Sequence, residues 1–382
     1  MNFNSVYQYN FPTTIRFGAG AVKELPAYLK SHQLKAPLIV TDPVVAQLPF
    51  FKEILADLQK NGISTEVFSD IHKNPVKSDV YKGTEVWDNT GRDSVVGIGG
   101  GAGLDVARAI VLRIYHREDL FKYDDLVGGD VYVTNDVPHF ITVPTTSGTG
   151  SEVGRSAIIA DDETHQKKIL FSPKLMARIV FADPLLTMDI PPAITAATGM
   201  DALTHNLEAF LAKNYHPMCD GIALEGMKLV HGAIERATLR PDLESRAQML
   251  LGSMMGAIAF QKGLGVVHSL AHPLSSLLDT HHGLANAVNL PYGMEFNIAG
   301  FEDKFRGIAR HLELRNESGE GVVQDLTELN SRINIPARLR DIGVKEEHIE
   351  TLADLAVADF AHPNNPKPVT REDFKQLYLK AW

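Results

Sequence analysis

In the first half of the chain, two patterns of apolar and polar residues alternate regularly. Short runs of apolar, mostly β-branched residues alternate with longer stretches whose apolar residues recur at helical spacing. The runs predict buried strands, and the stretches predict amphipathic helices. The predicted strands are 37–41, 64–68, 94–98, 139–143 and 177–181, with a hairpin of 157–159 and 168–170, and the predicted helices are 45–60, 78–89 and 104–115. This alternation is typical of a parallel, Rossmann-like sheet with crossover helices.

The second half of the chain carries almost only helical periods. The change follows Phe181 and is marked by Asp183-Pro184 and Pro191-Pro192, because proline restricts the residue before it and commonly begins or ends a helix. A chain of 382 residues also exceeds the usual size of one hydrophobic core. We therefore predict an α/β domain at 1–184 and an all-α domain at 185–382.

A glycine-rich turn follows the predicted strand 94–98 and opens the next helix. Its residues are Gly99, Gly100, Gly101 and Ala102, and Asp105 follows in the first turn of the helix. Bare backbone N–H groups at a helix N-terminus, together with the helix dipole, hold phosphate groups. The spacing departs from G-x-G-x-x-G, so we predict a dinucleotide-binding turn of another kind; the alternative is a tight turn without a ligand.

A second small loop, rich in hydroxyl groups, follows the predicted strand 139–143. It contains Thr145, Thr146 and Ser147, and loops at the carboxyl ends of strands in an open α/β sheet meet where ligands bind. Asp42 ends the first predicted strand. Its carboxylate suits an adenosine ribose and would repel a 2′-phosphate, which favours NAD over NADP. Alternatively, Asp42 caps the helix that follows it.

Two pairs of polar residues with a spacing of four lie in the predicted helical half. Asp201 and His205 form one pair, His268 and His272 form the other, and His282 follows after a short loop. This spacing puts both side chains of a pair on one helix face. The chain has 15 histidines, but these pairs lie among small and apolar residues, where unpaired polar groups are costly. One carboxylate with several imidazoles suits Fe²⁺ or Zn²⁺ rather than calcium.

Composition narrows the class of protein. Hydrophobic residues make up 44% and charged residues 22%, and a net charge of -10 without a stripe of Lys and Arg argues against a nucleic-acid partner. No apolar run is long enough to span a bilayer, and the N-terminus lacks a signal-peptide pattern. The single cysteine, Cys219, excludes an intrachain disulfide and fits a reducing compartment. We expect a cytoplasmic protein.

Five segments together resemble the iron-containing (group III) alcohol dehydrogenases, and the resemblance covers nearly the whole chain. The segments are 99–101, 144–152, 197–205, 263–274 and 282–287. The resemblance implies the architecture shared with dehydroquinate synthase, an α/β nucleotide-binding domain followed by a helical domain. It also implies a metal-dependent, NAD-linked enzyme that oxidises small primary alcohols or reduces aldehydes. The implied metal is Fe²⁺, with Zn²⁺ as the alternative.

The resemblance also implies roles for single residues of the helical half. Asp201, His205, His268 and His282 look like the four metal ligands. His272 looks like a non-ligand histidine near the nicotinamide, and it is our candidate for taking or giving the hydroxyl proton.

Several residues of the α/β half fall where the family contacts the cofactor. They are Asp42, Asn74, Gly101, Ala102, Thr145, Thr146 and Lys167. Lys168 is adjacent to Lys167, and a one-residue slip would exchange the two. The chain departs from the family's usual Ser and Lys with Ala102 and Arg108, and Ala102 removes one hydroxyl from the phosphate site.

The sequence allows more than one interpretation of the substrate, the enzyme class and the oligomeric state. Segments 220–226 and 259–263 look similar to 4-hydroxybutyrate dehydrogenases, and Arg155 either pairs with a substrate carboxylate or forms a structural ion pair. Glycerol dehydrogenases and dehydroquinate synthase share the architecture, and a nucleotide- or metal-binding sensor is a non-enzymatic alternative. The family commonly forms dimers through its N-terminal region, so we expect a homodimer or larger homo-oligomer in which Val6 to Ile15 adds a strand across a two-fold axis.

Overall fold

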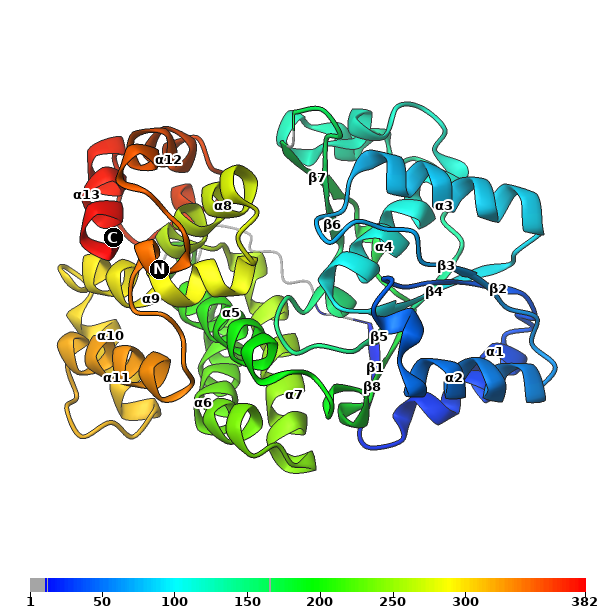
Figure 1. Cartoon of the computed structure of the whole chain (residues 1–382), viewed down its shortest axis with the longest axis horizontal. Coiled ribbons are helices and arrows are strands. Elements are labelled where there is room, and N and C mark those ends of the chain that lie inside the picture. The colour runs from blue at the N-terminus through cyan, green and yellow to red at the C-terminus, as the bar shows by residue number, and fades with distance from the viewer. Residues whose placement is uncertain (1–10, 12, 165) are drawn as a thin grey trace, which may run out of the picture. The chain divides into compact units, whose positions relative to one another are not determined.

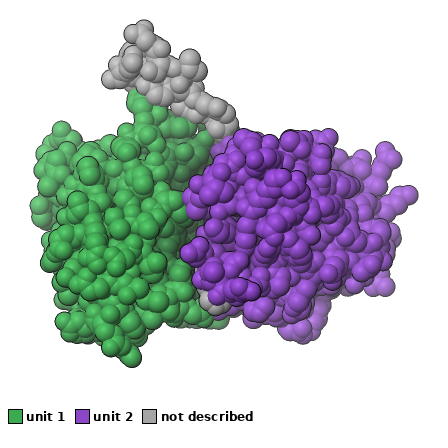
Figure 2. Space-filling view, turned by 90° about the horizontal axis from the view of Figure 1, so that it is seen from above, with its two compact units in different colours: residues 1–11, 147–149, 190–382 green, residues 12–146, 150–189 purple. Residues whose placement is uncertain are grey.

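The computed structural model of the chain divides into two compact units (Figure 2), and it describes residues 11, 13–164 and 166–382. Among these residues, unit 1 contains Phe11, Ser147–Thr149 and Ile190–Trp382. Unit 2 contains 13–146 and 150–189, apart from 165. The domain boundary predicted after residue 184 stays a prediction.

Unit 2 is built on a six-stranded parallel sheet (Figure 1) with the order β1-β8-β5-β4-β2-β3. The strands are β1 (Thr14–Phe17), β2 (Pro37–Val40), β3 (Glu66–Phe68), β4 (Ser94–Gly99), β5 (His139–Pro144) and β8 (Ile179–Ala182). Every residue of β2, β4 and β8 is buried. Strands covered on both faces read as continuous apolar runs, which is the pattern that predicted them.

Helices cover the two faces of this sheet. They are α1 (Leu25–Ser31), α2 (Pro49–Lys60), α3 (Lys77–Thr90) and α4 (Gly101–Tyr115). The side chains of β2 alternate between two cores: Leu38 and Val40 share one with α3 and α4, whereas Ile39 shares the other with α1 and α2. The predicted Rossmann-like layer is therefore observed.

Two helix starts differ from the predicted ones by three residues or more, whereas α3 is only one residue longer at each end than predicted. The stretch predicted as one helix from 45 is a 3₁₀ turn at Val45–Gln47 followed by α2, because Pro49 takes the first helical position, where no backbone N–H is needed. Helix α4 begins at Gly101, three residues earlier than expected, so the glycines form its first turn. The predicted hairpin is present as β6 (Ser156–Ala160) and β7 (Lys167–Phe171).

Unit 1 is helical, as predicted. Its helices are α5 (Pro192–Leu211), α6 (Pro217–Leu239), α7 (Leu243–Ala259), α8 (Val266–Leu278), α9 (His282–Ile298), α10 (Glu302–His311), α11 (Gly319–Arg332), α12 (Ile349–Val357) and α13 (Arg371–Ala381). Helix α5 packs against α6, α7 and α9 and is buried over most of its length, so its polar residues lie inside the unit. A helix that is buried on nearly all sides must satisfy those polar groups internally.

Short 3₁₀ helices connect these elements. They are η1 (Ala21–Glu24), η2 (Val45–Gln47), η3 (Leu120–Tyr123), η4 (Asp125–Val127), η5 (Gly129–Tyr132), η6 (Ser151–Val153), η7 (Pro173–Leu175), η8 (Pro184–Thr187), η9 (Phe260–Lys262), η10 (Leu339–Ile342), η11 (Glu346–His348) and η12 (His362–Asn364).

The structure bears only in part on two further predictions, the strand for a dimer contact and the lack of a membrane-spanning segment. The strand expected across Val6 to Ile15 lies mostly outside the described residues, and its described end belongs to β1, which pairs with β8 at the edge of the sheet. Within the described ranges, no single helix has the length and apolar character to cross a membrane. One bent pair, Leu243–Lys262 with Val266–Leu278, meets those criteria by length and composition.

Candidate metal centre and cofactor loops

Four predicted metal ligands come together in unit 1. Asp201 and His205 lie one turn apart on α5, His268 is in the first turn of α8, and His282 is the first residue of α9. From Asp201 Oδ1, the distances to the Nε2 atoms of His205, His268 and His282 are 3.9, 3.8 and 3.5 Å. Asp201, His205 and His268 are buried, with ligand atoms within 4.8 Å of one another. Three helices thus point four donor atoms at one place.

Glycine residues allow the close approach that this arrangement needs. A Cβ atom at Gly283 would lie 2.3 Å from the carbonyl oxygen of Ala197, so only glycine lets the start of α9 pack against α5. A Cβ atom at Gly148 would lie 2.8 Å from the Cβ atom of Thr198. The segment that contains Gly148 therefore also packs tightly against α5, beside the predicted ligands.

Hydrogen bonds to Nδ1 orient two of the histidines. His205 Nδ1 donates to the carbonyl oxygen of Gly148 at 3.3 Å, and His268 Nδ1 donates to Glu208 Oε2 at 2.6 Å. With Nδ1 carrying the proton, each neutral imidazole leaves the Nε2 lone pair toward Asp201. Glu208 is itself held, because it accepts the backbone N–H groups of Gly265 and Val267 at 3.0 and 2.6 Å. This carboxylate–histidine pairing is common behind metal-binding imidazoles.

Asn286 lies at the centre of the donor atoms. Its Nδ2 donates to Asp201 Oδ1 at 2.7 Å and lies 3.3 Å from His268 Nε2 and 3.2 Å from His282 Nε2. One amide nitrogen has two hydrogens, so it cannot satisfy three acceptors fully. The two hydrogens of the Asn286 amide therefore cannot satisfy all three lone-pair atoms, Asp201 Oδ1, His268 Nε2 and His282 Nε2, at the same time.

The charge states of the cluster suit a cation. Burial raises the pKa of Asp201, but attraction to His205, His282 and His268 outweighs burial and brings this pKa to about 2. Burial lowers the pKa of His205 to about 4. Burial also lowers the pKa of His268, but the hydrogen bond to Glu208, together with attraction to the carboxylates of Glu208, Asp201 and Asp359, outweighs burial, and the net shift is upward. Near neutral pH, an ionised Asp201 and a neutral His205 are the forms that bind metals.

The donor separations agree with a small divalent ion. Zn²⁺ and similar ions bind imidazole nitrogen and carboxylate oxygen at about 2.0–2.2 Å, so tetrahedral donors lie about 3.4 Å apart. The Asp201-to-histidine separations of 3.5–3.9 Å are close to that value. The residues therefore fit a group bound by one carboxylate and three imidazoles.

His272, the predicted proton-handling residue, lies beside this cluster. Its ring stacks on the ring of His282, with centroids 5.3 Å apart, and on that of Phe360 at 5.2 Å. Its Nδ1 donates to Asp359 Oδ2 at 2.8 Å. The structure thus places His272 next to the predicted ligands and fixes its ring plane.

Three residues of this site were missed by the sequence reasoning. Glu208 lies three residues after His205 and Asn286 four after His282, so helical spacing alone gave a signal for both. Asp359 offered no such signal, because it lies 87 residues from its partner His272.

The two predicted cofactor loops of unit 2 meet at the carboxyl ends of β4 and β5. Thr145 N–H donates to the carbonyl oxygen of Gly99 at 3.0 Å. A Cβ atom at Gly100 would lie 3.1 Å from the hydroxyl oxygen of Thr146, so glycine permits the loops to touch. Gly101 and Ala102 open α4, where their N–H groups are available to an anion. Ser147, the last predicted residue of this loop, belongs to unit 1.

Asp42 lies just after the end of β2, as both of its predicted roles, ribose binding and helix capping, require. Its Oδ1 accepts the backbone N–H groups of Val44 and Val45, each at 2.9 Å, so the predicted capping role is present. Its Oδ2 lies 3.5 Å from the Cβ position of Gly99, beside the glycine-rich turn. The two proposed roles of Asp42 therefore use different oxygen atoms and are compatible.

Asp105 and Arg108 bind protein groups under the loops. Asp105 accepts hydrogen bonds from the Ser151 hydroxyl at 2.6 Å and the Ile158 N–H at 3.1 Å. Arg108, where the family usually has Lys, is fully buried and donates to the Ser156 carbonyl oxygen at 2.9 Å. This network holds the hairpin and the hydroxyl-rich loop on α4, and the predicted contact of Asp105 with the cofactor stays a prediction.

The hairpin distinguishes the two neighbouring lysines. Lys168 forms an ion pair of 3.4 Å with buried Asp124. Lys167 pairs with Ala160, which also forms a bridge with Val76, two residues after Asn74. Lys167 and Asn74 thus lie near the same end of β6, which favours Lys167 over Lys168 as the residue that faces a cofactor.

Arg155 forms no structural ion pair with any residue that the structure describes. Its guanidinium lies over the ring of Phe171, 5.3 Å from the centroid. Within the described part of the chain, this guanidinium has no hydrogen bond or carboxylate partner. Burial lowers the pKa of Arg155, yet an arginine stays charged. A partly buried cation that the described residues leave without a counter-ion therefore follows β5 and its loop.

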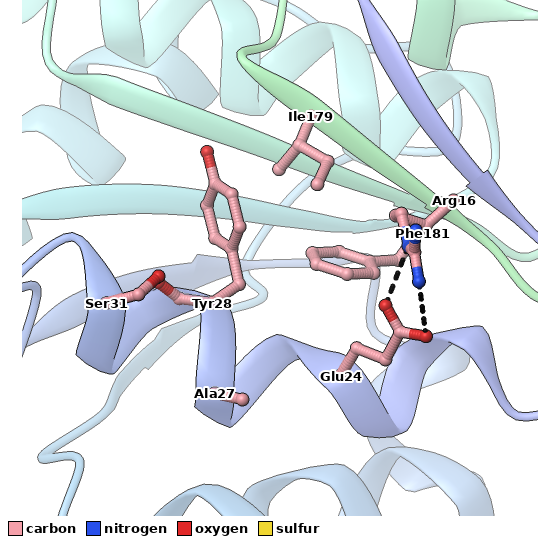
Figure 3. A pocket seen from close by; sticks show the side chains of 7 residues that line it. All are labelled: Arg16, Glu24, Ala27, Tyr28, Ser31, Ile179 and Phe181. Carbon is pink, nitrogen blue, oxygen red and sulfur yellow. Dashed lines mark hydrogen bonds and ion pairs between the residues drawn. The ribbon is translucent and has the colours of Figure 1, made fainter.

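A cavity of about 430 Å³ in unit 2 lies elsewhere (Figure 3). It is lined by Tyr28 on α1 and by Ile179 and Phe181 on β8. Its two charged groups, Arg16 and Glu24, bond each other at 2.7 and 2.9 Å. The cavity includes none of the predicted site residues, and its charges are already paired, so we do not assign the chemistry to it.

Comparisons with known proteins agree with this geometry. A family model described as "Iron-containing alcohol dehydrogenase" matches residues 12–184, and one described as "Fe-containing alcohol dehydrogenase family, C-terminal" matches 195–382. The chain is 36% identical to a 4-hydroxybutyrate dehydrogenase from Cupriavidus necator over 375 residues, which cover 96% of this chain and 97% of that protein.

Solved structures give the same result. A 1,3-propanediol oxidoreductase superposes with a TM-score of 0.94 and 31% identity, covering 99% of this chain and 100% of that one. A sulfoacetaldehyde reductase from Bifidobacterium kashiwanohense, solved in complex with NAD⁺, superposes with a TM-score of 0.89 and 26% identity, covering 99% of both chains. The predicted fold class, an α/β unit and a helical unit, is confirmed. The chain belongs to the iron-containing alcohol dehydrogenase family and is an oxidoreductase that acts on alcohols.

Proposed function

We propose that this enzyme transfers hydride between NAD and a small primary alcohol or the corresponding aldehyde, with Asp201, His205, His268 and His282 as its metal ligands. The observation that carries the proposal is the convergence of three Nε2 atoms on Asp201 Oδ1 at 3.5–3.9 Å. Iron or another divalent metal and NAD are the cofactors of this family. When bound, the metal would supply Lewis-acid chemistry at the substrate oxygen, and NAD would accept the hydride.

The chain's own residues hold and orient the reacting groups. The Nδ1 contacts of His205 and His268 fix these rings, so that their Nε2 atoms stay aimed at one place. His272, beside them, takes the hydroxyl proton during alcohol oxidation and returns it during aldehyde reduction. In the α/β unit, the N–H groups of Gly101 and Ala102 hold the pyrophosphate, and Asp42 binds the adenosine ribose.

One experiment tests the proposal as a whole. The protein is purified anaerobically, its metal content is measured by elemental analysis, and NADH formation is followed by absorbance with a panel of primary alcohols. We expect about one bound iron or zinc per chain and turnover with at least one short alcohol. Lyase chemistry without net NADH formation would instead favour a dehydroquinate-synthase-like enzyme, and binding without turnover would favour a sensor.

The choice between NAD and NADP is tested by Asp42→Asn. The amide keeps an oxygen that can cap Val44 and Val45 but removes the negative charge. A charge beside a 2′-phosphate costs on the order of 1 kcal/mol or more, so we expect the NADP/NAD ratio of kcat/KM to rise about tenfold. An unchanged ratio with unchanged stability would mean that Asp42 only caps the helix.

A short hydroxy acid is a second candidate substrate, favoured by the guanidinium of Arg155, which has no carboxylate partner among the described residues. A carboxylate on the substrate would supply the counter-ion that the described residues do not supply. For Arg155→Gln, we expect kcat/KM to fall at least about tenfold with 4-hydroxybutyrate and to change little with butan-1-ol, since a charge-assisted hydrogen bond is worth roughly 1.5–3 kcal/mol.

The matched control for this substitution is Arg117→Gln, which removes an exposed guanidinium already paired with Asp88 at 2.7 Å. A wild-type preference for butan-1-ol, together with equal effects of Arg155→Gln on both substrates, would count against a hydroxy acid. The cytoplasmic location and the homodimer or larger homo-oligomer stay predictions.

A further inference from the structure

We propose that Asp359 is a positioning residue for His272, one that sets which imidazole nitrogen carries the proton and in which direction the other nitrogen points. The inference rests on the proposed function, since it assumes that His272 handles the hydroxyl proton. Asp359 follows α12, whereas His272 lies on α8, so the pair joins two elements that are distant in sequence.

The carboxylate of Asp359 is held on both oxygens. Oδ2 accepts the Nδ1–H of His272 at 2.8 Å. Oδ1 accepts the hydroxyl of Ser269 at 2.6 Å and the N–H of Ala361 at 2.9 Å. The Ser269 hydroxyl oxygen in turn accepts the N–H of His362 at 2.9 Å, so its hydrogen stays directed at Asp359. A carboxylate fixed by such contacts can impose an orientation on its partner.

Stacking fixes the remaining freedom of the imidazole. The ring of His272 stacks on the rings of both His282 and Phe360, with interplanar angles of 13° and 27°. The hydrogen bond to Asp359 prevents a flip of the ring within that plane. Among the described residues, Nε2 of His272 has no hydrogen-bond partner, so this nitrogen is left for substrate or water.

This arrangement has a chemical consequence for each direction of the reaction. An ionised carboxylate only accepts, so the neutral His272 carries its proton on Nδ1 and presents a lone pair at Nε2. In alcohol oxidation, for which bound NAD⁺ would supply the hydride acceptor, the hydroxyl proton moves to Nε2 of His272. The resulting imidazolium is stabilised by Asp359 until Nε2 releases the proton to water. Aldehyde reduction runs the same transfers backwards.

The test is a double-mutant cycle of Asp359→Asn and His272→Ala, with kcat, KM and metal content measured for each variant. We expect Asp359→Asn to lower kcat on the order of tenfold to a hundredfold, part of the roughly 10²–10⁴ that a positioned acid–base group contributes. KM and metal content should stay near wild type. In the His272→Ala background, Asp359→Asn should have no further effect, because its partner is gone.

Asp354→Asn is the matched control, since Asp354 lies on α12 and pairs with Arg371 at the surface. An equal loss from Asp359→Asn with and without His272 would assign Asp359 a merely structural role and overturn the inference. Full activity of Asp359→Asn beside an inactive His272→Ala would overturn it too. Full activity of His272→Ala would instead overturn the proton-handling role in the proposed function.

A measurement on the wild-type protein keeps the inference testable if Asp359→Asn does not fold. Histidine labelled with ¹⁵N in the zinc-loaded protein reports the tautomer of each ring by two-bond ¹H–¹⁵N correlations. We expect the neutral His272 to carry its hydrogen on Nδ1. A hydrogen on Nε2 would contradict the role given to Asp359.

Discussion

Replacement of His268 by alanine should remove both the bound metal and turnover. His268 is buried and supplies one of the three imidazole nitrogens that face Asp201. The substitution also leaves the buried carboxylate of Glu208 without the Nδ1–H that it accepts at 2.6 Å. The lost ligand weakens metal binding, and the buried charge without its histidine partner destabilises the site that holds the metal. Elemental analysis and NADH formation, measured on the same preparation, check both expectations.

His231→Ala is the matched control for that result. His231 lies on α6 in the same unit and bonds Asp325 at 2.6 Å, so its loss removes a similar contact elsewhere. We expect metal content and turnover of this control to stay near wild type. A metal-free His268→Ala protein with full activity would rule out the proposed ligand set.

Glu208→Gln should lower the affinity for the metal by about tenfold to a hundredfold, the usual effect of removing a carboxylate behind a metal-binding imidazole. Glu208 accepts two backbone N–H groups as well as the Nδ1–H of His268. A glutamine has one acceptor oxygen, and its NH₂ group would face N–H donors. The His268 ring then loses the contact that keeps its Nε2 lone pair toward Asp201.

Competition with a chelator in zinc titrations of the metal-free protein measures this affinity. Glu225→Gln, an exposed carboxylate on α6, is the control and should leave the affinity unchanged. Equal affinities of Glu208→Gln and wild type would show that the orientation of His268 does not depend on Glu208.

The sequence predicted the layers of this fold well, because burial on one or two faces leaves a periodic trace. The runs at 37–41 and 94–98 are apolar apart from Thr41 and Ser94 at their ends, and both became central strands. Helix starts were less predictable. Pro49 divides the stretch from 45 into two helical pieces, and Gly101 enters α4 despite its low helix propensity.

Only those contacts of the candidate site that lie within one helix could be predicted from the sequence. Asp201 and His205 share a helix face, so their approach follows from sequence. The partners that orient the site come from other helices: Glu208 meets His268 across 60 residues, and Asp359 meets His272 across 87. Tertiary packing decides such contacts, and a single sequence does not encode them as a period.

The hydroxyl-rich loop, finally, is one short segment with contacts to both predicted sites. Thr145 bonds the glycine-rich turn, and three residues along the chain the carbonyl of Gly148 holds His205. If a cofactor orders this loop at the glycine-rich turn, we expect the orientation of the His205 imidazole to respond. Such coupling is reciprocal: the factor by which cofactor strengthens metal binding equals the factor by which metal strengthens cofactor binding. A measured dependence of NAD affinity on metal occupancy would therefore also give the dependence of metal affinity on NAD.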